Sequence, residues 1–262
     1  MTRRWVRLGL LGCGVFLAAL VYQFPAAWAL HLAREHGPVA LTWEGADGSV
    51  FDARVQRLGL SLPTGAQAVL GPVDLELQPL AALTGGLPVR FRAQGYAGEI
   101  AGSARLGPAG WSADTVRGRL PLGALPRLVP ELAMAGLEGT VLFRARDLAG
   151  PYAGPPRAGH LRASLEDLRV GLLQADEPLG AYSVRVALTP EGDVDGRVET
   201  VADRPLLGVE GTVSGDLGAR RLGFRGRGWA REGAPPGVRD ILPLLGQVND
   251  GEVRIKWQGS LP

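Results

Sequence analysis

Apolar and polar side chains alternate strictly in residues 89–94, Val89-Arg90-Phe91-Arg92-Ala93-Gln94. Successive side chains of a β-strand point to opposite faces of the sheet, so this alternation predicts a strand with one buried and one solvated face. The same pattern recurs in residues 73–78, 184–188 and 253–258. It is typical of antiparallel sheets, because the strands of parallel sheets are buried on both faces. We therefore expect an all-β fold with a mainly antiparallel sheet.

Turn signals separate the predicted strands. The chain of 262 residues contains 39 glycines and 20 prolines, which are spread along its length. Short turn motifs follow one another at the spacing of hairpins: Asp47-Gly48, Pro63-Thr64-Gly65, Pro108-Ala109-Gly110, Pro190-Glu191-Gly192 and Asp250-Gly251. Three short stretches begin at or near proline and are predicted helices: Pro79 to Leu83, Leu122 to Leu132, and Pro236 to Leu245.

The β-rich region, residues 37–262, has one linker-like stretch at 150–159. A weak repeat of short helix, turn and strand on either side of it suggests two similar halves. The same stretch also fits one long loop in a continuous sheet. An amphipathic sheet must bury its apolar face against a second sheet in a sandwich, against itself by folding over, or against a hydrophobic ligand. The sequence leaves these alternatives open.

The N-terminus carries a predicted membrane span. Residues 8–33 contain no Asp, Glu, Lys or Arg, and about 20 apolar residues suffice for a helix to cross a bilayer. Arg3, Arg4 and Arg7 precede the span, so the positive-inside rule predicts that residues 1–7 form a short cytoplasmic end. We expect one transmembrane helix that anchors the β-rich region on the far side of the membrane.

Two alternatives to an uncleaved anchor remain. Ala27-Trp28-Ala29 resembles a signal-peptidase site, which would place the cleavage after Ala29. Leu10-Leu11-Gly12-Cys13 resembles a lipoprotein box, although too few apolar residues precede it. All three interpretations export the β-rich region.

The charge distribution argues against nucleic-acid binding. Residues 1–36 hold four of the 28 basic and one of the 26 acidic residues, which leaves 24 basic and 25 acidic residues in 37–262. A nucleic-acid binder would instead have a basic stripe interleaved with aromatic residues on its folded domain. Cys13 is the single cysteine, so neither an intramolecular disulfide nor a cysteine-based metal site is expected.

No constellation of catalytic or ligand-binding residues stands out. Glycine motifs of hydrolases, nucleotide-binding loops and dinucleotide-binding folds are absent. His31 and His36 are expected at the membrane edge, and His160 lies alone in a predicted strand. Asp193-Val194-Asp195-Gly196 lacks the further ligands of a calcium loop and is interpreted as a hairpin turn. The tryptophans are expected to be core anchors. We therefore predict no catalytic, cofactor-binding or metal-binding residue, and no enzymatic activity.

Several segments, in order, resemble the type II secretion system protein N family (general secretion pathway protein N). Gly48-Ser49-Val50-Phe51-Asp52-Ala53 resembles the family's early glycine motif, with Phe51 for its usual tryptophan and Ala53 for its glycine. Residues 77–85 resemble its strand that ends in a Pro-Leu-x-x-Leu turn. The likeness continues through residues 120–122, 137–141, 179–188, 205–211 and 242–261. It covers nearly the whole chain, although each motif alone carries little information.

The resemblance implies a non-enzymatic accessory component of the machinery that moves folded proteins across the outer membrane of Gram-negative bacteria. By this resemblance, we expect the chain to be a single-pass inner-membrane protein with residues 37–262 in the periplasm. Its expected partners are other type II secretion components and the inner membrane. The alternative is an AsmA-like envelope protein that handles lipids, because such proteins also carry an anchor before amphipathic antiparallel strands that line a groove with their apolar face.

Overall fold

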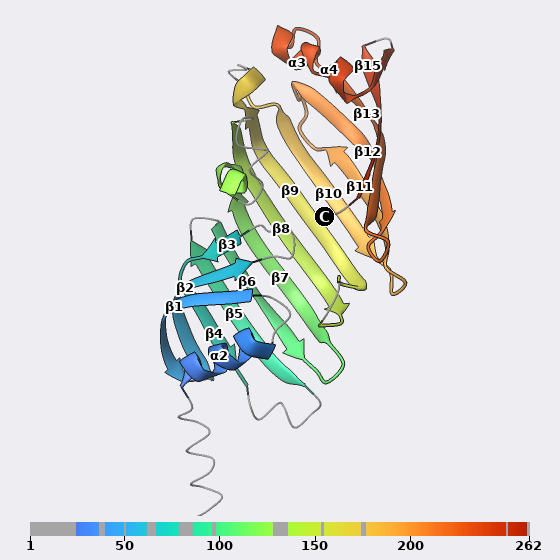
Figure 1. Ribbon diagram of the computed structural model, residues 1–262. Helices are drawn as coiled ribbons and strands as arrows, with labels where there is room; N and C mark the ends of the chain where they lie inside the picture. The colour runs from blue at the N-terminus through green and yellow to red at the C-terminus, as the bar shows by residue number, and fades with distance from the viewer. Residues whose placement is uncertain are drawn as a thin grey trace, which may run out of the picture.

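A single antiparallel sheet dominates the computed structural model (Figure 1). The structure describes residues 25–36, 40–49, 51–61, 67–78, 86–95, 98–127, 136–152, 155–173, 177–249 and 251–260. Within them, 15 strands follow the order β1-β2-β4-β5-β6-β7-β8-β9-β10-β11-β12-β13-β15-β14, and β3 pairs with β2. The prediction of a mainly antiparallel all-β fold is therefore confirmed.

The strands of the N-terminal part are β1 (Ala40–Ser49), β2 (Asp52–Ser61), β3 (Gln67–Leu70), β4 (Val73–Leu77), β5 (Leu87–Gly95), β6 (Gly98–Leu106), β7 (Trp111–Pro121) and β8 (Leu137–Gly150). Those of the C-terminal part are β9 (Ala158–Val170), β10 (Gly180–Leu188), β11 (Asp193–Thr200), β12 (Leu207–Asp216), β13 (Arg221–Ala230), β14 (Gln247–Asn249) and β15 (Glu252–Ser260). Most neighbours in the sheet are also neighbours in the sequence, so the sheet is a long meander.

The helices are few and short. They are α2 (Ala26–His36), α3 (Pro236–Asp240) and α4 (Leu242–Leu245), with 3-10 turns at Leu122–Arg127 and Gly171–Leu173. The helical prediction for residues 236–245 is confirmed, and that for 122–132 holds over 122–127 as a 3-10 turn. Residues 79–83 lie outside the described residues.

The predicted membrane span falls largely outside the described residues, since 8–24 are not among them. Residues 26–33 belong to α2, which packs beside β1. In the part of the chain that the structure describes, no helix combines the length and apolar character needed to cross a membrane.

Predicted turns fall between strands in two well-defined cases. The turn at residues 190–192 joins β10 to β11, and the Gly192 N–H donates to the carbonyl of Thr189 at 2.9 Å. Gly192 has φ +97°, a conformation that favours glycine. Residues 108–110 join β6 to β7. The interpretation of Asp193 to Gly196 as a turn is wrong: these residues begin β11, because the chain has already reversed at Gly192.

Residues 151–157 connect β8 to β9, and these two long strands pair with each other. The loop at residues 151–157 therefore joins two paired strands of the same sheet. Trp111 helps to fix this loop, because its Nε1–H donates to the carbonyl of Pro151 at 3.1 Å.

Two hydrophobic clusters lie at opposite ends of the sheet. The N-terminal cluster contains Val55, Val73 and Ala93, and Leu30 of α2 packs against it. The C-terminal cluster contains Leu179, Leu206, Leu207, Ala234, Val238, Leu242 and Val253. Val238 and Leu242 come from α3 and α4, so short helices cover the sheet at both of its ends.

Candidate functional site

The apolar face of the sheet between the two clusters forms a continuous floor. One row of this face consists of residues that lie directly opposite one another on successive strands. We use the name apolar floor for these ten residues: Phe91, Gly102, Val116, Ala145, Leu161, Val186, Gly196, Val213, Phe224 and Trp257. The row is set by the strand register and by the two-residue period of the side chains.

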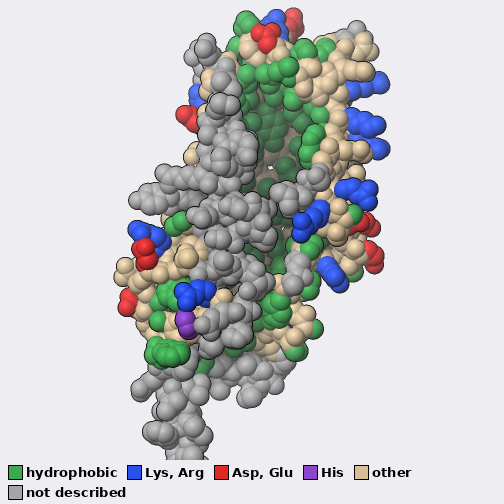
Figure 2. Space-filling view, viewed as in Figure 1, with side chains coloured by type: hydrophobic (Ala, Val, Ile, Leu, Met, Phe, Trp, Pro, Cys, Tyr) green, Lys and Arg blue, Asp and Glu red, His purple; other side chains and the backbone are tan. Residues whose placement is uncertain are grey.

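The apolar floor lies on the hollowed side of the sheet. Helix α2 lies in front of the sheet in Figure 1, and its Leu30 packs on the same face as the floor. Figure 2, seen from that side, shows hydrophobic side chains gathered in an elongated hollow over the central strands. Most floor residues are only half-buried, and among the described residues no second sheet packs on them.

Aromatic rings lie flat on glycines of neighbouring strands and keep the floor shallow. A Cβ atom on Gly118 would collide with the ring of Phe143, and one on Gly211 or Gly226 would lie 2.8 Å from Cζ of Phe224. None of these three glycines has a positive φ, so close neighbours call for glycine here. At Gly118 the closest neighbour is the ring of Phe143, whereas at Gly211 and Gly226 backbone atoms of the adjacent strand lie even closer than the ring of Phe224. Rings that lie along the sheet cover backbone without filling the hollow above it.

The tryptophans only partly match their predicted role as core anchors. Trp43 packs against the N-terminal cluster. Trp257 ends the apolar floor with 54% of its surface exposed, and Trp28 of α2 is also exposed. Trp5 lies outside the described residues.

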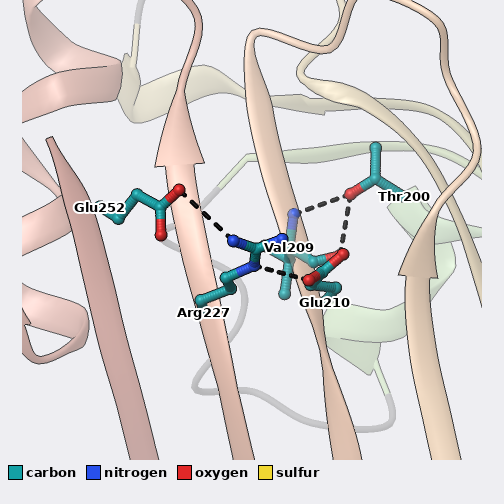
Figure 3. A network of polar contacts seen from close by, with 5 residues as sticks. All are labelled: Thr200, Val209, Glu210, Arg227 and Glu252. Atoms are coloured by element: carbon teal, nitrogen blue, oxygen red, sulfur yellow. Dashed lines mark hydrogen bonds and ion pairs between the residues drawn. The ribbon is translucent and has the colours of Figure 1, made fainter.

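Polar contacts tie β11 to β12 and join β12, β13 and β15 (Figure 3). Arg227 donates through Nε to Glu210 at 2.5 Å, and its guanidinium lies 3.5 Å from the Glu252 carboxylate. The hydrogen bond that Arg227 donates to Glu210, together with the negative charges of Glu210 and Glu252, raises the pKa of Arg227. At the end of β11, the Thr200 hydroxyl donates to the Val209 carbonyl at 2.8 Å and accepts from the Val209 N–H at 2.7 Å. Thr200 thus continues the strand pairing where β11 and β12 separate.

Tyr182 makes a similar bridge inside the C-terminal end of the sheet. Its side chain is buried, and its hydroxyl donates to the Leu207 carbonyl at 2.7 Å. Burial raises the pKa of Tyr182 to about 12. A neutral, hydrogen-bonded phenol in this place joins β10 to β12 across β11, which is a structural role.

The outer face carries a row of arginines that the sequence analysis missed. Five of them stand directly opposite one another on consecutive strands, and we call them the arginine row: Arg117 on β7, Arg144 on β8, Arg162 on β9, Arg185 on β10 and Arg197 on β11. All five are exposed. They are far apart in the sequence, so only the strand register brings them together. The available signal was an arginine between apolar residues in each strand, such as Val116-Arg117-Gly118 and Val184-Arg185-Val186.

The histidines do not come together. His31 lies in α2, where it is 3.2 Å from Arg34, and His160 is exposed on the outer face of β9. Across the described ranges, no group of three or more His, Cys, Asp or Glu residues is placed to hold a metal ion. The geometry therefore offers two surfaces, the apolar floor and an outer face that carries the arginine row.

The sequence also matches a known family model. The model described as Type II secretion system (T2SS), protein N matches residues 39–258, which run from just before β1 into β15. Comparisons with curated proteins and with solved structures give no match.

Proposed function

The chain belongs to the type II secretion system protein N family, and from this we propose that it is a non-enzymatic, structural component of the secretion machinery. The observation that carries the proposal is the extent of the match, which includes almost the entire sheet. A surface of this kind suits an adaptor, because neighbouring proteins can dock on its faces without any reaction taking place.

In this proposal, residues 8–33 anchor the protein in the inner membrane, residues 1–7 are cytoplasmic, and the sheet lies in the periplasm. The uncharged stretch and the three arginines before it support this topology. N-terminal sequencing of the mature protein tests it. A chain that starts at Leu30 would refute the uncleaved anchor while leaving the exported sheet in place.

Crosslinking in cells tests the role in secretion. A photoreactive amino acid is placed at Ala187, which faces outward on β10, and at Val186, which faces the apolar floor. We expect crosslinks to other secretion components from at least one face, together with reduced exoprotein secretion in a deletion strain. Recovery of no secretion component from either position, with normal secretion in the deletion strain, contradicts the proposal.

The apolar floor favours a second candidate, a protein that handles lipids. A half-buried hydrophobic surface of this length matches acyl chains, which gain free energy in proportion to the apolar area they remove from water. Lipid extraction and mass spectrometry of the purified full-length protein test this candidate. We expect co-purified lipid to fall in Val186→Glu, which puts a charge on the floor, and not in Ala187→Glu, which puts it on the outer face. Equal lipid in both variants and in the parent protein removes the candidate.

A further inference from the structure

The arginine row places like charges against one another at the closest spacing a sheet allows. Neighbouring strands are about 4.8 Å apart, so the five residues span about 19 Å from Arg117 to Arg197. Like charges directly opposite each other on adjacent strands destabilise a sheet. A row of five therefore needs a compensating charge or has a purpose other than stability.

Among the described side chains, carboxylates compensate only one end of this row. Glu199 lies 3.1 Å from Arg185 and 3.7 Å from Arg197. No carboxylate of the described residues lies within ion-pair distance of Arg117, Arg144 or Arg162. The remaining sequence, outside the described ranges, contains only three acidic residues, Glu131, Asp176 and Asp250.

Shallow hollows accompany the row. One of about 790 Å³ is bounded on one side by Arg92, Arg117 and Arg144. Its lining also includes the carboxylates of Asp52, Asp74 and Glu76. A second, of about 360 Å³, is lined by Arg162, Arg185 and Arg197, together with one carboxylate, that of Asp195. Both are open to solvent, so guanidinium groups at their edges are accessible to a chain that is laid across the strands.

We propose that the arginine row binds an extended, acidic segment of a partner protein. Guanidinium groups bind carboxylates through paired, charge-assisted hydrogen bonds. Because the side chains of an extended chain alternate between its two faces, every second residue of an acidic segment faces the row. At about 3.3 Å per residue, an extended segment of about six residues covers the 19 Å of the row. This deepens the proposed function, because it states the chemistry of a partner of the adaptor.

The shape of the sheet favours a polypeptide over other anions. Adjacent strands are rotated by roughly 20°, so the outermost arginines of the row point in directions that differ by roughly 80°. A flat membrane surface meets only the central members of such a row, whereas a flexible chain follows all five. Single-stranded nucleic acids bind mainly through bases stacked on aromatic residues, and the row contains none.

Fluorescence anisotropy with a labelled poly-glutamate peptide of about ten residues tests the proposal on the purified full-length protein in a non-ionic detergent. In the double variant Arg144→Gln with Arg162→Gln, we expect the affinity for the peptide to fall about tenfold or more. Each substitution removes a hydrogen bond between two charged groups, which contributes more free energy than a neutral hydrogen bond. The matched control, Arg204→Gln with Arg239→Gln, removes the same charge from exposed residues outside the sheet and should bind like the parent. Circular dichroism confirms that both variants are folded.

Three results would overturn the proposal. The first is no peptide binding by the parent protein, and the second is an equal loss in the row variant and its control. The third is tighter, row-dependent binding of phosphatidylglycerol vesicles or of a single-stranded oligonucleotide than of poly-glutamate, since the row then serves another anion. Each of these results leaves the role in secretion untouched, because that role is read from crosslinks and exoprotein levels in cells.

Discussion

Replacement of Arg144 by threonine should stabilise the protein. Arg144 lies at the centre of the arginine row, directly opposite Arg117 on one side and Arg162 on the other. The substitution removes two like-charge contacts and introduces a β-branched residue that suits a strand.

The magnitude follows from the cross-strand contacts. A directly opposed pair contributes roughly 0.2–1 kcal/mol, so two repulsive pairs cost roughly 0.4–2 kcal/mol. Because the side chains are exposed and screened by water, we expect the lower half of that range, about 0.5–1 kcal/mol. In a domain of this size, each kcal/mol of added stability raises the melting temperature by about 2–4 °C.

The assay is urea unfolding followed by tryptophan fluorescence, in low salt and in about 1 M salt. At high salt the Debye length falls to about 3 Å, so the advantage of Arg144→Thr should shrink. Arg185→Thr is the matched comparison. Arg185 also stands between two arginines, but it forms an ion pair with Glu199 at 3.1 Å, so its loss should be close to neutral.

The reasoning is refuted if Arg144→Thr lowers the unfolding midpoint in low salt. It is also refuted if the gain is the same in both salt conditions, or if Arg185→Thr gains as much. Any of these outcomes would mean that the long arginine stem, and not its charge, decides the stability of the row.

Three further substitutions test the packing described above. Gly118→Ala should cost about 1–3 kcal/mol in the free energy of unfolding, because the new methyl group collides with the Phe143 ring; urea unfolding measures it. Thr200→Val should cost about 1–3 kcal/mol, because it leaves the N–H and carbonyl of Val209 without the hydroxyl; thermal denaturation measures it. Tyr182→Phe should cost about 1 kcal/mol at neutral pH. The folded-state pKa of Tyr182 is raised to about 12, so the contribution of Tyr182 to the free energy of unfolding is complete below pH 10 and is lost as the pH rises to 12. The parent protein should therefore lose more stability than Tyr182→Phe between pH 8 and pH 12.

Controls separate these effects from general damage. Gly123→Ala should be nearly neutral, because the nearest atom to its Cβ is 3.9 Å away, and Phe143→Leu should partly rescue Gly118→Ala. Thr200→Ser keeps the hydroxyl and should retain most of the stability. A neutral Gly118→Ala, a neutral Thr200→Val, or identical pH profiles for the parent and Tyr182→Phe would each contradict the corresponding contact.

The sequence predicted the local structure better than the arrangement in space. Alternation in residues 89–94 and 253–258 correctly indicated strands with one apolar face, because the period of two is a property of the strand itself. It could not indicate that all strands belong to one open sheet, since that depends on pairing between strands. The prediction of a turn at Asp193 to Gly196 was wrong for a related reason. Acidic residues are common in turns, but here the chain reverses just before them, at Gly192.

The two candidate surfaces could be predicted from the sequence to different degrees. The alternating pattern predicts an apolar sheet face that needs a cover, and in the structure this face is hollowed and half-buried between its covered ends. The arginine row was not foreseen, because Arg117 and Arg197 are separated by 80 positions and align only through the register of four strand pairs. The near-neutral charge of residues 37–262 also gave no sign of it, since acidic residues such as Glu76 and Glu210 balance other arginines of the same face.

The meander has a consequence for how the protein reaches its folded state. From β5 to β12, every strand pairs with the strands before and after it in the sequence, so most contacts join segments that are close along the chain. Low contact order of this kind favours rapid folding, and in architectures where each unit contacts only its neighbours, folding can propagate from one unit to the next. A chain that emerges N-terminus first can therefore add one strand at a time to a growing edge, with each new hairpin completing the one before it.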